Sequence, residues 1–144
     1  MKKRFNSKFP KGPAKKATVT GPMELEIQGY THDLKGVSRY QSKAVFVEGA
    51  LLGEKVVAKV EREQGRFITA TVDKIIQTSE QRVDAQCPYY GQCGGCNLWH
   101  MQAEQQIDAK QQVLADQLGR QNVQTEQWLP ALKGPLTAYR RRAR

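Results

Sequence analysis

Short stretches of alternating apolar and polar residues fill the first half of the chain, a pattern typical of half-buried β-strands. Leu25 and Ile27 alternate with polar neighbours, and further apolar or alternating runs occupy residues 44–47, 55–61, 67–72 and 74–76. Five short strands separated by glycines, over residues 18–79, predict a small β-barrel that is closed or nearly closed, since closure removes exposed sheet edges. Phe46 and Phe67 lie within the apolar runs, so we expect them in the core.

The pattern changes after residue 79. Residues 80–100 are irregular and contain every cysteine. Residues 101–121 are predicted to contain one amphipathic helix, because Ile107, Leu114 and Leu118 fall on one face and Gly119 can end it. Residues 122–144 have no clear pattern, and we expect them to begin a second domain that is truncated at Arg144. The predicted fold class is therefore mainly β.

The length and composition of the chain limit the classes of protein to which it can belong. The chain has 144 residues, of which 39% are hydrophobic and 26% are charged, enough for one small domain with an appendage. No apolar run approaches the roughly 20 residues that span a bilayer. We therefore expect a soluble cytoplasmic protein, a monomer without membrane association, whose thiols are reduced.

The formal net charge of +9 is concentrated at the two ends of the chain. Residues 1–17 contain seven basic residues and no acid, and residues 139–144 contain four more basic residues. All 14 acids lie between these ends, so residues 17–138 sum to −2. Residues 1–17 are expected to form a basic disordered arm, and both ends to bind a polyanion through its phosphates. A solubilising tail is the alternative.

Cys87, Cys93 and Cys96 form the pattern C-x5-C-x2-C in a glycine-rich loop. Thiolates are soft ligands that iron and zinc prefer. Glycines at 91, 94 and 95 let the backbone wrap tightly, so that its N–H groups can donate to sulfur. The spacing predicts a metal or cluster site, with reduced structural thiols as the alternative.

The number of ligands in the chain does not decide between zinc and an iron–sulfur cluster. His100 follows Cys96 as C-x3-H and would complete a four-ligand Cys3His zinc site. A 4Fe–4S cluster needs four cysteines, and the chain has three, so the fourth would lie beyond Arg144. His100 is otherwise a surface or packing histidine.

Several runs resemble a known RNA-modifying family. Residues 33–39 and 44–54 resemble a TRAM domain, and residues 82–88 and 93–96 resemble the cluster loop that follows it in bacterial 23S ribosomal RNA uracil-5-methyltransferases. The closing Tyr-Arg-Arg-Arg-Ala-Arg, residues 139–144, is similar to the strand that opens their central domain. The resemblance covers roughly residues 20–144 and implies an N-terminal fragment of such an enzyme.

The resemblance implies that Cys87, Cys93 and Cys96 bind a structural 4Fe–4S cluster together with a later cysteine. It also implies that S-adenosylmethionine and the catalytic cysteine belong to a separate Rossmann-like domain. The chain has no G-x-G-x-x-G fingerprint and no cysteine outside the loop. We therefore expect no catalytic residue in this fragment and no methylation by it alone.

The partner that the resemblance implies is 23S rRNA, and OB-like barrels bind single strands through charged grooves and base stacking. The predicted RNA-binding residues are basic side chains of the ends and the barrel: Lys2, Lys3, Arg4, Arg39, Lys43, Arg140, Arg141 and Arg142. Candidate stacking residues are Tyr30, Tyr40 and Phe67. The alternatives are a free-standing, zinc-stabilised RNA-binding module and a ribosome-associated barrel with inert thiols.

Overall fold

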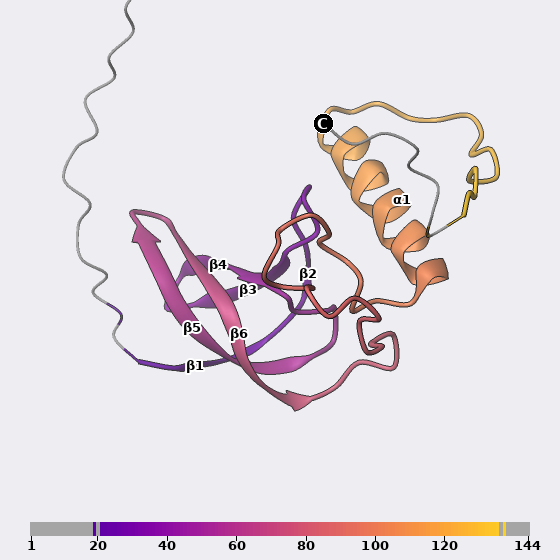
Figure 1. Cartoon of the computed structure of the whole chain (residues 1–144). Coiled ribbons are helices and arrows are strands. Elements are labelled where there is room, and N and C mark those ends of the chain that lie inside the picture. Colours follow the sequence, from indigo (N-terminus) through magenta and orange to yellow (C-terminus); the bar gives the residue numbers. More distant parts are fainter. Residues whose placement is uncertain (1–18, 20, 136, 138–144) are drawn as a thin grey trace, which may run out of the picture.

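The computed structural model describes residues 19, 21–135 and 137. These residues form one curled sheet, an irregular segment and a helix beside the sheet (Figure 1). The strands are β1 (Met23–Glu26), β2 (Gly29–Tyr30), β3 (Gly36–Tyr40), β4 (Lys43–Glu48), β5 (Lys55–Gln64) and β6 (Phe67–Gln77), and the helix is α1 (Ala103–Arg120). The prediction of a mainly β fold is confirmed, with six strands in the described residues where the sequence predicts five.

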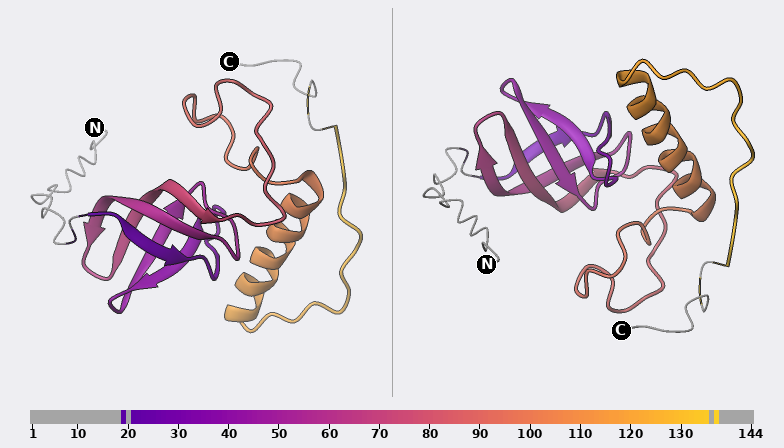
Figure 2. Two further views of the ribbon diagram at one scale, coloured as in Figure 1. Left: turned by 90° about the horizontal axis from the view of Figure 1, so that it is seen from below. Right: turned by 90° about the horizontal axis from the view of Figure 1, so that it is seen from above.

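The two edges of the sheet meet because they are consecutive parts of the chain. The strand order β1-β5-β6-β4-β3-β2 places β1 and β2 at opposite edges, yet only two residues separate them. The Ile27 N–H donates to the Glu54 carbonyl oxygen beside β5, and the Gln28 N–H donates to the Val37 carbonyl oxygen in β3, at 2.9 and 2.8 Å. This segment therefore bridges both edges, and the strands wrap around a common interior (Figure 2).

Strand pairing follows the alternation of the sequence. All neighbouring strands are antiparallel except β4 and β6, which run parallel. β3 and β4 are joined by a two-residue turn, in which Gln41 and Ser42 have the positive φ of 45° and 68° that such hairpin turns require. The runs 67–72 and 74–76, predicted as two strands, are the single strand β6, whose register with β5 shifts at three points.

Inward-facing apolar side chains from β1, β4, β5 and β6 fill the barrel. The buried cluster consists of Met23, Leu25, Ile27, Val45, Val47, Ala50, Val56, Ala58, Ile68 and Ala70. Phe46 and Phe67 are absent from this cluster, because their neighbours in the strands point inward and they therefore point outward. The expectation that these two phenylalanines are core residues is wrong.

The sequence misses two elements, the short strand β2 and strand β3. Gly36 begins β3 and lies buried against the interior. A methyl group at Gly36 would come within 2.9 Å of Ile27 Cγ2 and 3.1 Å of Ala50 Cβ. Glycine is thus needed at this position for close packing of the strand that closes the barrel.

Replacing Gly36 with alanine should lower the free energy of unfolding by about 1–3 kcal/mol, because the added methyl overpacks the core. Chemical denaturation of the chain measures this loss. Gly29→Ala is the matched control, since a methyl there meets nothing within 4 Å. Equal stabilities for the two variants would contradict the packing described here.

Helix α1 packs on the barrel through a second cluster of buried residues, Leu51, Leu98, Met101 and Ala109. The predicted apolar face is partly wrong, since Leu114 is 47% exposed and the helix buries Ala109 instead. The helix also passes Gly119 and ends at Arg120, where Asn122 adopts a φ of 56° and the Val123 N–H donates to the Leu118 carbonyl oxygen at 2.9 Å. Nowhere in the described part of the chain is a helix long and apolar enough to cross a membrane.

Candidate functional site

The cysteine loop leaves the body of the protein and returns to it at one point. Arg82 and Met101 form an isolated antiparallel bridge. The Val83 N–H donates to the His100 carbonyl oxygen at 3.0 Å, and the Gln102 N–H donates to the Gln81 carbonyl oxygen at 2.9 Å. Residues 83–100 are therefore a single excursion whose two ends are held together at its base.

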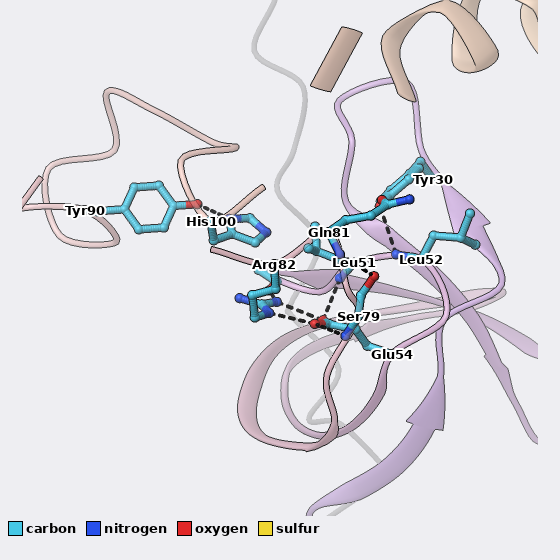
Figure 3. A network of polar contacts seen from close by, with 10 residues as sticks. Tyr30, Leu51, Leu52, Glu54, Ser79, Gln81, Arg82, Tyr90 and His100 are labelled. Atoms are coloured by element: carbon cyan, nitrogen blue, oxygen red, sulfur yellow. Dashed lines mark hydrogen bonds and ion pairs between the residues drawn. The ribbon is translucent and has the colours of Figure 1, made fainter. Parts of the chain in front are cut away.

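Glu54 fixes this base to the barrel. Its carboxylate is fully buried and accepts hydrogen bonds from Arg82 Nε at 2.6 Å and Arg82 Nη2 at 2.8 Å. The Leu51 and Ser79 N–H groups also donate to it, at 2.8 and 3.3 Å. Arg82 Nη2 further donates to the Gly49 carbonyl oxygen at 2.7 Å. Figure 3 shows the Arg82 guanidinium directed at the Glu54 carboxylate. The bidentate ion pair therefore fixes the orientation of Arg82, the residue from which the cysteine loop starts.

The charge of Glu54 is stabilised by these partners. Burial acts to raise the pKa of Glu54, but hydrogen bonds from Arg82, Leu51 and Ser79 and the positive charge of Arg82 outweigh it, so the pKa lies below its ordinary value. The carboxylate is therefore ionised at neutral pH, and the pair is a charged structural link between barrel and loop.

The three cysteines lie in the outer part of the loop as free thiols. Cys87 is half-buried, and Cys93 and Cys96 are exposed. The Tyr90 N–H donates to the Cys87 carbonyl oxygen, and the Cys93 N–H donates to the Tyr89 carbonyl oxygen, both at 3.1 Å. These bonds form successive turns that connect the first two cysteines.

The backbone around Cys93 has features of a sulfur-binding loop. Gly94 has a φ of 69°, and the Gly95 N–H donates to Cys93 Sγ at 3.4 Å. A Cβ at Gly95 would lie only 3.3 Å from that sulfur, so a side chain there would crowd it. An N–H donor to sulfur and glycines that keep the backbone close to it are what a thiolate-ligated centre uses.

The donor set fits an iron–sulfur cluster in its chemistry, with three thiols from one loop as the soft ligands. In the described part of the chain, no three His, Cys, Asp or Glu side chains are gathered closely enough to hold a metal ion. Binding of a cluster would therefore require the exposed sulfurs of Cys93 and Cys96 to turn toward Cys87. Both exposed cysteines are adjacent to glycine, which permits such a turn.

His100 lies at the base of the loop and is not gathered with the three thiols in the described part of the chain. Its side chain is buried, and its Nδ1 is hydrogen-bonded to the Tyr90 hydroxyl, which itself donates to the Asn97 carbonyl oxygen at 2.9 Å. Burial lowers the pKa of His100 to about 4, and the nearby positive charge of Arg82 acts in the same direction. The ring is therefore neutral at neutral pH. Its Nε2 is buried without a hydrogen-bond partner, but the described residues do not gather it with the three thiols, as a Cys3His zinc site would require.

The predicted RNA-binding residues have different surroundings. Arg39 is exposed on β3. Lys43 is ion-paired with Glu63, so its charge is partly used within the protein. The remaining predicted residues lie outside the described part of the chain: Lys2, Lys3, Arg4, Arg140, Arg141 and Arg142.

The candidate stacking residues also differ. Tyr40 packs against the barrel core. Tyr30 packs against the second cluster, and its hydroxyl accepts a hydrogen bond from the Leu52 N–H at 2.9 Å. Phe67 is partly exposed on the outer face, where its ring centroid lies 5.6 Å from that of Phe46. Of the three, Phe67 is thus the residue whose ring faces outward from the sheet.

Sequence reasoning gave no role to Glu54, Arg82 or Tyr90. Glu54 follows the glycine of a turn and looks like a surface residue, and its partner Arg82 is 28 positions away. The available signal was a single acid directly before an alternating strand, which is too common to indicate a buried ion pair.

Comparison with known proteins gives one consistent result. A Halomonas elongata protein named 23S rRNA (uracil(1939)-C(5))-methyltransferase RlmD is 44% identical over 136 residues, which are 94% of this chain and 28% of the relative. Proteins of the same name from Pseudomonas putida and a Marinomonas species are 39% and 45% identical, covering 99% and 86% of this chain and 33% and 28% of their own lengths. No protein-family model matches.

These relatives match nearly the whole chain, including the barrel and the cysteine loop, while the chain spans about a third or less of each relative. Over the residues it contains, the chain belongs to the family of bacterial 23S rRNA (uracil-C5)-methyltransferases.

Proposed function

We propose that this chain is the RNA-binding and iron–sulfur-binding part of a 23S rRNA uracil-5-methyltransferase. The observation that carries the proposal is the similarity of nearly the whole chain to relatives with that name. The cysteine loop, which starts from the buried Glu54–Arg82 pair beside the barrel, supports it. Such a construction holds a cluster site and an RNA-binding barrel at a fixed distance from each other.

In this proposal Cys87, Cys93 and Cys96 hold a 4Fe–4S cluster with a fourth thiolate from elsewhere. When bound, the cluster would supply rigidity to the loop, with no electron transfer required. Methyl transfer from S-adenosylmethionine would belong to parts of the enzyme beyond these residues, so the chain by itself would not methylate RNA. In this proposal the protein is cytoplasmic and its partner is 23S rRNA.

The basic ends would contribute affinity that does not depend on sequence. Each phosphate neutralised by a lysine or arginine releases counterions, so the logarithm of the affinity falls linearly with the logarithm of salt concentration. Residues 2–16 contain seven of the 23 basic residues. These basic residues would contact the phosphates of the RNA backbone, while the barrel positions the RNA strand.

Replacing the seven basic residues of 2–16 with glutamine should weaken binding of the chain to an unmodified 23S rRNA transcript and flatten its salt dependence. For single-stranded RNA the slope should become shallower by at most about 5, since each phosphate contact contributes roughly 0.7. Fluorescence anisotropy over a salt series measures the slope, and Lys110→Gln with Lys133→Gln serves as the control for charge alone. An unchanged slope would make the arm a passive tail, and failure of the unaltered chain to bind RNA would end the proposal.

A further inference from the structure

The outer face of the sheet carries an aromatic pair that the barrel core does not use. Val45, Val47, Ile68 and Ala70 point inward and are at most 2% exposed. Phe46 and Phe67 alternate with them and therefore lie on the outer face of β4 and β6. Their ring centroids are 5.6 Å apart, with planes inclined by 39°.

Two exposed arginines flank this pair, one on each side. In the strand register Arg39 pairs with Ala44, which pairs with Phe67. Arg62 pairs with Thr69, which pairs with Phe46. Each arginine is thus two strands, or about 10 Å, from the phenylalanine in its row. Both arginines are exposed on the same outer face.

Three acidic residues of β4 and β5 lie on or behind this face, and two of them are ion-paired with lysines. Glu63 is ion-paired with Lys43 and accepts the Val19 N–H at 3.0 Å. Glu48 lies 3.6 Å from Lys35 Nζ, and Glu61 accepts a hydrogen bond from the Thr71 hydroxyl. A hydroxyl partner does not neutralise a carboxylate, so Glu61 keeps its negative charge beside the positive charges of the two arginines.

The face continues into a hollow beside α1. A cavity of about 380 Å³ lies between Val37 and Phe46 of the sheet and Val113, Gln117 and Arg120 of the helix, with Asp116 also on its wall. Its volume is at the lower end of the range of small-ligand sites, about 300–1,000 Å³. One wall is aromatic and the opposite wall has hydrogen-bonding side chains, as recognition of one planar base requires.

We propose that the face formed by Arg39, Phe46, Arg62 and Phe67, here called the aromatic platform, stacks unpaired bases of an RNA strand whose phosphates contact the two arginines. The platform deepens the RNA binding proposed above and rests on it. Aromatic rings with flanking cations favour single-stranded nucleic acid, because every base has a face that can stack and every nucleotide has a charge. A protein partner is the competing occupant, and the test below distinguishes it.

The test measures binding of the chain to a fluorescein-labelled oligouridine. Phe46→Leu and Phe67→Leu should each weaken binding by about fivefold or more, because leucine keeps the apolar volume but cannot stack. The salt dependence should not change in these variants. Arg39→Gln with Arg62→Gln should weaken binding and also flatten the salt dependence.

Three controls keep the test specific. Phe67→Tyr retains an aromatic ring and should retain binding. Trp128→Leu removes an exposed aromatic residue away from the platform, and should have no effect. With an oligonucleotide whose central nucleotides are abasic, the parent and the Phe→Leu variants should bind equally, because no base remains to stack.

The possible outcomes distinguish a failure of the aromatic platform from a failure of the proposed RNA binding. If the parent binds oligouridine and both Phe→Leu variants bind equally well, the platform is wrong while the proposed function stands. If these variants keep their RNA affinity but change the oligomeric state in light scattering, the face contacts protein and the proposal is overturned. If the parent binds no RNA, the proposed function fails and the platform with it.

Discussion

Replacing Arg82 with methionine is expected to lower the free energy of unfolding of the chain by about 3 kcal/mol at neutral pH. The change leaves the fully buried carboxylate of Glu54 without its charged partner. Breaking a buried ion pair from one side typically costs about 3–5 kcal/mol. We expect the lower end, because Arg82 remains 18% exposed and the Leu51 and Ser79 N–H groups still donate to the carboxylate.

The pH dependence should distinguish this cause from a simple packing loss. In the parent, the pKa of Glu54 is lowered, so its ionised form adds stability above the ordinary value of 4.5, and that stability is lost as the pH falls below it. In Arg82→Met, burial is no longer opposed by arginine, and we expect the pKa of Glu54 to rise above its ordinary value. The difference in free energy of unfolding between the parent and the variant should therefore become smaller as the pH is lowered from neutral.

Urea unfolding at neutral and mildly acidic pH measures both effects. Arg66→Met is the matched control, since Arg66 is exposed in the turn between β5 and β6. Adding Glu54→Leu to Arg82→Met should restore part of the stability, because an apolar pair can replace a buried ion pair. A loss in Arg82→Met that is independent of pH, or no greater than in Arg66→Met, would contradict the role given to this pair.

Substituting any one of Cys87, Cys93 or Cys96 with serine should abolish iron–sulfur binding by the chain. Anaerobic reconstitution with iron, sulfide and 2-mercaptoethanol as an external fourth thiolate should give a brown species that absorbs near 400 nm, with about four irons per chain. A cubane cluster left with two protein thiolates is not expected to persist. The measurement is the absorption spectrum together with iron and labile sulfide content.

His100→Ala is the control for the identity of the metal. His100 is buried, is hydrogen-bonded to Tyr90 and is not gathered with the thiols in the described residues, so this variant should still take up iron and sulfide. One zinc per chain that is lost in His100→Ala would instead favour a Cys3His site. Retention of the spectrum in a cysteine variant would remove that cysteine from the ligand set.

The sequence predicted the barrel wherever apolar residues alternate, and failed where they do not. β3 was missed because its inward positions are Gly36 and Ser38, which carry no hydrophobic signal. Phe46 was placed in the core because the run from Ala44 to Val47 is apolar at every position, so alternation could not tell the two faces apart. The register with β6 decides that face, and register is a tertiary property.

The candidate site could likewise be predicted from the sequence only in part. The cysteine loop was readable because its ligand types and glycines are adjacent in the chain. The Glu54–Arg82 pair was not, because it joins a turn of the barrel to the base of the loop, and a single acid and a single arginine have no local pattern. The buried position of His100 likewise depends on Tyr90, which reaches it across the folded loop.

Thiol alkylation is the most direct test of whether one centre joins the three cysteines. The chain is reconstituted without oxygen, treated with iodoacetamide and analysed by mass spectrometry, before and after the iron is removed under denaturing conditions. We predict that Cys87, Cys93 and Cys96 are protected together and become reactive together when the iron leaves. Three thiols that react independently, at the same rates with and without iron and sulfide, would contradict the account.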